Sequence, residues 1–267
     1  MNILWIKDNN VGHEKQVKVL LDELSKTRDI NVIQLNVKGF HPLFKYVDPV
    51  EENLFDLIIG AGHKTYSFII DIKKSQKKSC KTVAILTPSF NKDKFDLICA
   101  PAHDQNKFNN SNNVIFYEGS LAKVSLDEAD ENIILVAIGG KSKHYYFDED
   151  SILNQIQYFL SVYPNKEYYV FNSRRTPVSM NNKIAKLAET KEIIFCDYKN
   201  NDISFESILH KSSAKLITRD SVNMVFESLS CKGNTYLIDM KIKNKMNKVV
   251  KTVNNLIEQK KIGYIEQ

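Results

Sequence analysis

The stretch AKLITRDSVNMVFES, residues 214–228, decides the fold. Its first five residues, 214–218, are typical of a buried strand, and the apolar spacing after Ser221 predicts a helix. The simplest role for Asp220 or Ser221 is to cap this helix with a side-chain oxygen. The alternative is that the helix N-terminus opens into the crevice at the carboxyl end of a parallel sheet, where α/β proteins bind ligands and phosphates in particular.

The same alternation of strand and helix continues along the chain of 267 residues. Short runs rich in Ile, Val and Leu alternate with longer amphipathic segments, which is typical of parallel strands buried on both faces. A first series of predicted strands comprises NILWI, NVIQLN, FDLIIGAG, TVAIL, FDLICAP and NVIFYEG, with helices at residues 12–26 and 64–76. A second series comprises NIILVAIGG, EYYVFN, EIIFCD, AKLIT and NTYLID, with helices near residues 149–163, 178–190, 203–212 and 221–232.

Two such series predict two Rossmann-like α/β domains with parallel sheets that face each other across a cleft. The polar stretch KVSLDEADEN separates the series, and we place the domains at residues 1–130 and 131–267. The final segment, residues 244–261, is expected to form a long helix that can lean back on the first domain.

Composition narrows the class of protein. The formal net charge of +5 suits an anionic ligand or an anionic membrane surface and is weak evidence for nucleic acid. The sequence shows no apolar run of about 20 residues and no signal-peptide core, so we expect a cytoplasmic location. Four cysteines without CxxC spacing indicate buried free thiols rather than disulfides or a zinc site.

Three strand ends of the second series carry residues suited to phosphate. Gly139 and Gly140 let a backbone without Cβ approach a phosphate, although a plain tight turn is the simpler interpretation. Arginines after the next strand are either surface charges or phosphate ligands. Because these ends belong to one parallel sheet, we expect them to meet at one rim. The predicted donor-binding residues there are Gly139, Gly140, Lys141, Ser173, Arg174, Arg175, Thr218, Arg219, Asp220 and Ser221.

Glu227 completes the predicted donor site. It lies six residues beyond Ser221, a rise of about 9 Å along a helix, which is near the span from a pyrophosphate to a ribose. A carboxylate there can accept hydrogen bonds from the ribose hydroxyls. The alternative is an ordinary surface glutamate.

In the first series, acids and histidines follow strands. Gly12 stands between a strand and a helix with Asp8 and His13 beside it, and Gly62-His63 and His103-Asp104 end later strands. A histidine near such a turn commonly binds a backbone group. Opposite a phosphate site, however, a histidine with a carboxylate can act as general base for an acceptor hydroxyl. The predicted catalytic residues are His13, Asp8 and Asp104, whereas His41 and His210 are expected to be structural.

The motifs WIKDNNVGHEKQ, DLIIGAGHKT, FDLICAPAHD, AIGGKSKHYYF, SRRTP and TRDSVNMVFES, in this order, resemble the mitochondrial-fission-protein family. The resemblance spans nearly the whole chain. Plant members are linked to mitochondrial fission, and bacterial members look like GT-B glycosyltransferases of the cell envelope. It implies a two-domain GT-B fold with the nucleotide-sugar donor on the second domain and the acceptor on the first.

The resemblance also implies roles for particular residues. On the acceptor side it adds Gln16 to the set, which then comprises Gly12, Gln16, Gly62, His63 and His103. Asp220 is expected to hold its turn rather than touch phosphate, because a carboxylate repels a diphosphate. The chain departs from the family after Asp197, where Asn-Pro-Tyr is usual, and after Gly233, where Pro-Val is usual. The first departure affects the loop that would contact the base or the sugar.

We therefore expect a metal-independent glycosyltransferase that moves a sugar from a nucleotide donor to a lipopolysaccharide, lipooligosaccharide or similar envelope glycan. No cofactor is expected besides the nucleotide-sugar substrate, and no nucleic acid partner. A peripheral contact with the inner membrane surface is compatible with the charge. Two alternatives stay open: a non-catalytic binding or scaffold protein that retains the cleft, and a nucleotide-sugar epimerase on the same fold.

Overall fold

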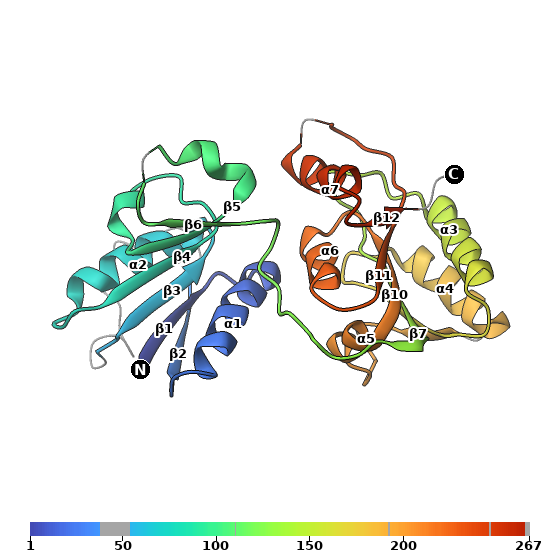
Figure 1. Cartoon of the computed structure of the whole chain (residues 1–267), viewed down its shortest axis with the longest axis horizontal. Helices are drawn as coiled ribbons and strands as arrows, with labels where there is room; N and C mark the ends of the chain where they lie inside the picture. Colours follow the sequence, from blue (N-terminus) through green and yellow to red (C-terminus); the bar gives the residue numbers. More distant parts are fainter. Residues whose placement is uncertain (38–53, 110, 192, 246, 265–267) are drawn as a thin grey trace. The chain divides into compact units, whose positions relative to one another are not determined.

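The computed structural model describes residues 1–37, 54–109, 111–191, 193–245 and 247–264 (Figure 1). The chain divides into two compact units, Met1–Ala122 and Lys123–Gln267. Each unit is a parallel sheet of six strands covered by helices, which confirms the predicted α/β class. His41 lies outside the described residues.

The first unit has the strand order β2-β1-β3-β4-β5-β6. The order reverses between β1 and β3, and open α/β sheets bind ligands at the carboxyl ends of strands beside such a reversal. Its strands are β1 (Asn2–Lys7), β2 (Asn31–Asn36), β3 (Leu57–Ala61), β4 (Lys81–Ile85), β5 (Leu97–Pro101) and β6 (Val114–Tyr117). Its helices are α1 (Val11–Ser25) and α2 (His63–Ser75), with the 3-10 turns η1 (Lys92–Lys94) and η2 (Ala102–Lys107).

The sheet of the first unit is buried on both faces because neighbouring residues of each strand point to opposite sides. Ile3 and Trp5 of β1 pack in a cluster with Val17 of α1. Leu4 and Ile6 pack in a second cluster with residues of α2. This explains why the strands are continuous apolar runs in the sequence.

The second unit has the strand order β12-β11-β10-β7-β8-β9. Here the order reverses between β7 and β10, as in a doubly wound Rossmann sheet. Its strands are β7 (Asp130–Ala137), β8 (Glu167–Phe171), β9 (Ile193–Cys196), β10 (Ser212–Thr218), β11 (Asn234–Ile238) and β12 (Gly263–Tyr264). Its helices are α3 (Glu149–Val162), α4 (Val178–Thr190), α5 (Phe205–Lys211), α6 (Val222–Leu229) and α7 (Lys248–Glu258).

Two clusters form the core of the second unit. One lies on the face covered by α3 and α4, and the other on the face covered by α5 and α6. α7 contributes Val250 to the first cluster and Val253 and Leu256 to the second. The apolar side of the last helix is therefore buried in its own unit, and its packing on the first unit stays a prediction.

The chain passes into the second unit after Ala122, whereas the sequence analysis placed this point after residue 130. The segment before β7 is held by the second unit. Ser125 donates its backbone N–H to the Ser230 carbonyl at 3.0 Å, and Lys123 pairs with Glu206 at 3.2 Å. These contacts join residues far apart in sequence, so local composition did not reveal them.

All four cysteines are buried free thiols, as predicted. In the described part of the chain, no helix is long and apolar enough to cross a membrane.

Candidate functional site

Three loops meet at the carboxyl edge of the second sheet. They follow β7, β8 and β10, which are neighbours in the order β10-β7-β8. The Gly139 N–H donates to the Thr218 hydroxyl at 2.7 Å, and the Ser173 hydroxyl donates to the Gly139 carbonyl at 2.8 Å. The structure therefore brings the three predicted strand ends together.

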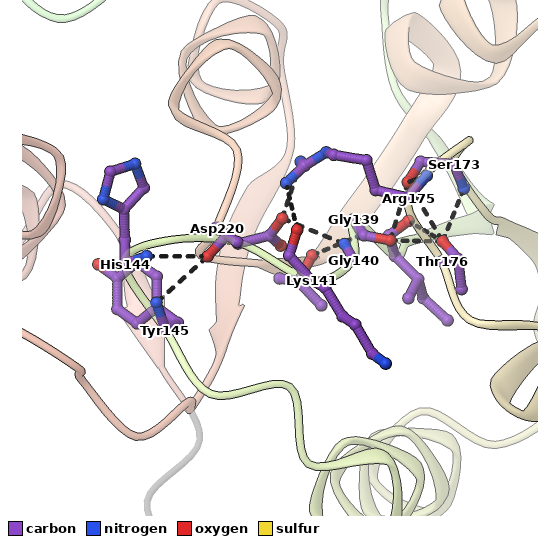
Figure 2. Close-up of polar contacts among 12 residues, drawn as sticks. Gly139, Gly140, Lys141, His144, Tyr145, Ser173, Arg175, Thr176 and Asp220 are labelled. Carbon is purple, nitrogen blue, oxygen red and sulfur yellow. Dashed lines mark hydrogen bonds and ion pairs between the residues drawn. The ribbon is translucent and has the colours of Figure 1, made fainter.

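Asp220 is the centre of this arrangement (Figure 2). Its side chain has no exposed surface, and its Oδ2 accepts the Gly140 N–H at 3.1 Å. The same oxygen pairs with Nη2 of Arg175 at 2.8 Å. A single carboxylate thus ties the ends of β7, β8 and β10, which is the turn-holding role expected for it.

The two glycines serve the packing of the loops. A Cβ on Gly139 would lie less than 3.0 Å from the Asp220 carboxylate, and one on Gly140 less than 3.0 Å from the Arg175 carbonyl. Their N–H groups are bound to Thr218 and Asp220. These glycines were predicted to let the backbone approach phosphate, but protein atoms fill the space beside them and accept from their N–H groups.

Side chains of the loop after β8 also form hydrogen bonds that hold the loop after β7 in place. Ser173 and Thr176 both donate hydroxyl hydrogens to the Gly139 carbonyl, and Thr176 was not among the predicted site residues. Arg175 donates from Nη1 to the Lys141 carbonyl at 3.3 Å. Ser173 and Arg175 therefore position the loops, in addition to any contact with ligand.

The carboxyl edge of the second sheet also carries the side chains of Arg174 and Lys141 and the N-terminus of α6. Arg174 and Lys141 are exposed, and no described residue pairs with the Arg174 side chain. Ser221 is the N-cap residue of α6, but its side chain makes no capping hydrogen bond. The partial positive charge of this helix end suits a phosphate. Glu227 lies further along α6 and is half-buried.

Arg219 does not lie on the open edge. It is 5% exposed, and its Nη2 pairs with Oδ1 of Asp239 beyond β11 at 3.0 Å. Arg219 was predicted to contact phosphate directly, but its side chain instead lies beneath the edge. The Arg219 side chain turns inward and pairs with Asp239, whose side chain is 46% exposed and which directly follows β11. The sequence around Arg219 does not indicate this partner.

A strap formed by residues 142–146 leads from the end of β7 to the loop after β11. Tyr145 is fully buried and forms an antiparallel bridge with Ile242. Lys243 donates its N–H to the His144 carbonyl at 2.9 Å. Since β10 lies between β7 and β11, the strap passes the carboxyl end of β10. This connection was not predicted.

In the first unit, Asp8 and His13 form a pair at the carboxyl end of β1. Oδ2 of Asp8 lies 2.8 Å from Nδ1 of His13, and Oδ1 accepts the Asn10 N–H at 3.0 Å. The Asp8 side chain is 7% exposed and that of His13 is 26% exposed. A carboxylate at Nδ1 favours the tautomer with its proton there, so Nε2 is the basic nitrogen.

Gly62, after β3, makes room for this pair. A Cβ on Gly62 would lie less than 3.0 Å from the His13 ring, and the residue has a φ of 88°, which favours glycine. Gly12 donates its N–H to the Asn10 side chain in the first turn of α1. The carboxyl end of β1 therefore holds a histidine that is oriented by a carboxylate.

The other predicted residues of the first unit are placed differently. Asp104 pairs with Lys107 at 2.9 Å, so the carboxylate on His13 is that of Asp8. Gln16 is buried and accepts from the Tyr117 hydroxyl at 3.0 Å and the Leu121 N–H at 3.3 Å, so it braces α1. His63 and His103 are exposed, and His63 packs edge-on against Tyr66.

No group of three or more His, Cys, Asp or Glu side chains among the described residues is arranged to hold a metal ion. Metal independence of the reaction stays a prediction.

Two parallel α/β units of this topology define a protein of the GT-B fold. Three solved structures are similar to the chain. The UDP-GlcNAc 2-epimerase from Methanocaldococcus jannaschii has a TM-score of 0.59 and 12% identity, over 99% of this chain and 89% of the epimerase. The S. aureus MnaA-UDP co-structure has a TM-score of 0.57 and 12% identity, over 96% of this chain and 88% of the MnaA chain. MurG of Acinetobacter baumannii has a TM-score of 0.55 and 9% identity, over 99% of this chain and 85% of MurG.

The chain belongs to the family described as Mitochondrial fission ELM1, whose model matches residues 11–266. This confirms the resemblance drawn from the motifs. Comparison with curated proteins finds no match.

Proposed function

We propose that this protein is a glycosyltransferase that moves a sugar from a nucleotide-activated donor to a hydroxyl of a cell-envelope glycan, such as a lipopolysaccharide or lipooligosaccharide core. One observation carries the donor half of the proposal. The rim held by Asp220 leaves the start of α6 and Arg174, whose side chain has no partner among the described residues, at the carboxyl edge of the second sheet. This is where α/β sheets bind nucleotides.

In the proposed reaction the second unit binds the donor diphosphate. The α6 dipole, Arg174 and Lys141 stabilise the negative charge that builds on the leaving nucleoside diphosphate. Glu227 accepts hydrogen bonds from the ribose hydroxyls. Asp220 stays behind the phosphates and holds the loops.

The Asp8–His13 pair serves the acceptor. Asp8 keeps the proton on Nδ1 of His13, so that Nε2 takes the proton of the acceptor hydroxyl as its oxygen attacks the anomeric carbon. The resemblance to bacterial family members supports an envelope glycan as acceptor. A cytoplasmic location with peripheral contact at the inner membrane belongs to the same proposal.

The names of similar structures support nucleotide sugars as the ligands to test first. One contains UDP, and another is a UDP-GlcNAc 2-epimerase. Thermal shift and saturation-transfer NMR should be run with UDP, GDP, dTDP, ADP, CMP and their sugars. At least one should bind; no binding at millimolar concentration would reject the proposal.

Epimerisation is the second candidate, because one of the three similar structures named above is a UDP-GlcNAc 2-epimerase. Incubation of the bound nucleotide sugar without acceptor separates the reactions. A C2-epimer product identifies an epimerase, whereas a transferase releases nucleoside diphosphate only when acceptor is added.

The family description favours a third possibility, a non-catalytic scaffold. Mass spectrometry of the envelope glycan from a deletion strain tests it. The transferase predicts loss of one sugar, and an unchanged glycan favours the scaffold.

A further inference from the structure

Four buried polar atoms without a hydrogen-bond partner among the described residues belong to neighbouring side chains at the carboxyl end of β10. They are Nδ1 of His144, Oη of Tyr145, Nε of Arg219 and Oδ1 of Asp220. Electrostatic interactions join Tyr145 to Arg219 and Asp220, and His144 to Asp220. A buried polar atom that is left unpaired destabilises the fold, so a cluster of them points to a ligand site. The side chains of His144, Tyr145 and Arg219 can each donate to an anion, whereas Asp220 cannot.

We propose that His144 is a ligand of the nucleotide phosphates and takes up a proton when the nucleotide sugar binds. The inference rests on the proposed nucleotide site and adds to it a residue and a coupling to pH. The donor site proposed above requires neither a contact with His144 nor a dependence of binding on pH.

The backbone around His144 is fixed from both sides. Its N–H and that of Tyr145 donate to the Ser142 hydroxyl, each at 3.2 Å, and its carbonyl accepts from Lys243. The buried Tyr145 anchors the strap in the core. The imidazole is thus held at the rim, and in Figure 2 it extends to the same side of the loop as the Arg175 guanidinium, whereas Lys141 extends to the other.

The charges that face the imidazole come from four loops. Asp220 follows β10, Lys143 lies on the strap, Arg175 follows β8 and Lys243 follows β11. Three are cations, and the carboxylate already pairs with Arg175. The surroundings of His144 are therefore electropositive, which favours an anion beside the ring.

Without ligand the imidazole is neutral at pH 7. Burial lowers the pKa of His144, Asp220 opposes this, and the three cations add to it. A diphosphate beside the ring offsets the cations and stabilises the imidazolium. Since the pKa is higher in the complex than in the free protein, binding takes up a proton, and affinity falls as the pH rises through the pKa of the complex.

The test uses the full chain and the tightest binder among UDP-GlcNAc, GDP-mannose, dTDP-glucose, ADP-glucose and CMP-sialic acid, whose phosphates do not titrate near pH 7. NMR follows the ring protons of the six histidines with pH, free and saturated. The signal absent from His144→Gln should titrate with a pKa higher by about one in the complex.

Calorimetry measures the same coupling as affinity. Between pH 8 and pH 6 the affinity of the unaltered protein should rise about three- to sixfold, since a pKa that is higher by about one gives tenfold only over a wider pH range, and that of His144→Gln should rise less than twofold. His210→Gln, which removes a histidine of α5 near Asp127, is the matched control and should keep the rise of the unaltered protein.

The outcomes separate the two proposals. If a nucleotide sugar binds but the His144 signal titrates alike in both states, His144 is not a phosphate ligand and the proposed function stands. The same holds if His144→Gln keeps the full pH dependence. If no nucleotide sugar of the panel binds, both proposals fail. Should His144→Gln not fold, the pH dependence of the unaltered protein, with His144→Asn for assignment, still decides.

Discussion

Arg175 and Asp220 form an ion pair across the ends of β8 and β10, with 2.8 Å between Nη2 and Oδ2. The two partners differ in exposure, since the Asp220 side chain is fully buried and that of Arg175 is 45% exposed. Loss of Asp220 therefore leaves an arginine that water can solvate, but also a buried Gly140 N–H that water cannot reach. The hydrogen bond to Gly140 is the larger structural contribution of this carboxylate.

Asp220→Ala should accordingly lower the free energy of unfolding by about 1–3 kcal/mol, the cost of a buried unpaired donor. Asp220→Asn should cost less, because the amide oxygen can still accept from Gly140. Urea unfolding of both variants measures the difference. Equal losses would mean that the charge, rather than the acceptor, stabilises the rim.

Arg174→Ala should weaken binding of the nucleotide sugar about tenfold or more, the value of one charge-assisted hydrogen bond, without loss of stability. Arg28→Ala removes another exposed arginine, in the first unit, and is the control. Calorimetry and thermal unfolding on the same samples give both quantities. Unchanged affinity in Arg174→Ala would remove this residue from the donor site. Ser221→Ala should act in the same direction.

Glu227→Gln should weaken a nucleoside diphosphate more than inorganic pyrophosphate, because an amide is a poorer acceptor for two ribose hydroxyls than a carboxylate. Competition binding of the two ligands to the same variant gives the ratio. A ribose role is ruled out if both ligands lose affinity equally.

His13→Ala should reduce turnover at least tenfold, since a positioned general base contributes about 10²–10⁴-fold. Asp8→Asn should also reduce turnover, because the carboxylate that keeps the proton on Nδ1 is lost. Donor affinity should stay nearly unchanged in both. Steady-state kinetics with calorimetry makes the comparison, and Asp104→Asn tests the other predicted carboxylate. Full turnover in His13→Ala would place the base elsewhere.

Lys215 should make stability depend on pH. It is fully buried in β10, its ammonium donates to the Gly233 carbonyl at 3.2 Å, and burial lowers its pKa to about 8 from 10.5. Between these pH values the unfolded chain holds a proton that the folded protein lacks, so the free energy of unfolding rises with pH.

The rise due to Lys215 amounts to at most about 3 kcal/mol. Lys215→Met should remove it, which urea unfolding between pH 7.5 and 10 would reveal as a difference from the unaltered protein. Lys211→Met, on the neighbouring helix α5, is an exposed control and should leave the slope in place. Identical slopes in the protein and in Lys215→Met would contradict the assignment.

The order of strands and helices could be predicted because each is a local apolar pattern. The helix expected at residues 178–190 has those bounds in α4. The last helix, Lys248–Glu258, is shorter than the expected residues 244–261, because the Asn247 side chain caps its start and Gln259 is already its C-cap residue. Residues 241–243 pair with the strap. β12 has only two residues, Gly263 and Tyr264, too few for a periodic signal. Pairings between distant segments leave no trace in local spacing.

The meeting of the strand ends of the second sheet was predicted correctly, whereas the ligand contacts of their residues stay predictions. Residues at strand ends were identified because topology alone brings such ends together. Which of them face a ligand depends on partners from other loops. Gln16 accepts from the Tyr117 hydroxyl, and Arg219 pairs with Asp239. The N–H groups of Gly139 and Gly140 donate to Thr218 and Asp220. A single sequence shows the polar group but not the neighbour that satisfies it.

The segment of residues 123–129 has a practical consequence for expressing the halves of this protein separately. A fragment that began at residue 131 would lack the first residue of β7 and the Ser125 N–H that the Ser230 carbonyl accepts. It would also lose the ion pair of Glu128 with Lys232. Starting the plasmid insert at Lys123 retains all of these contacts, so the second unit is best cloned from that codon.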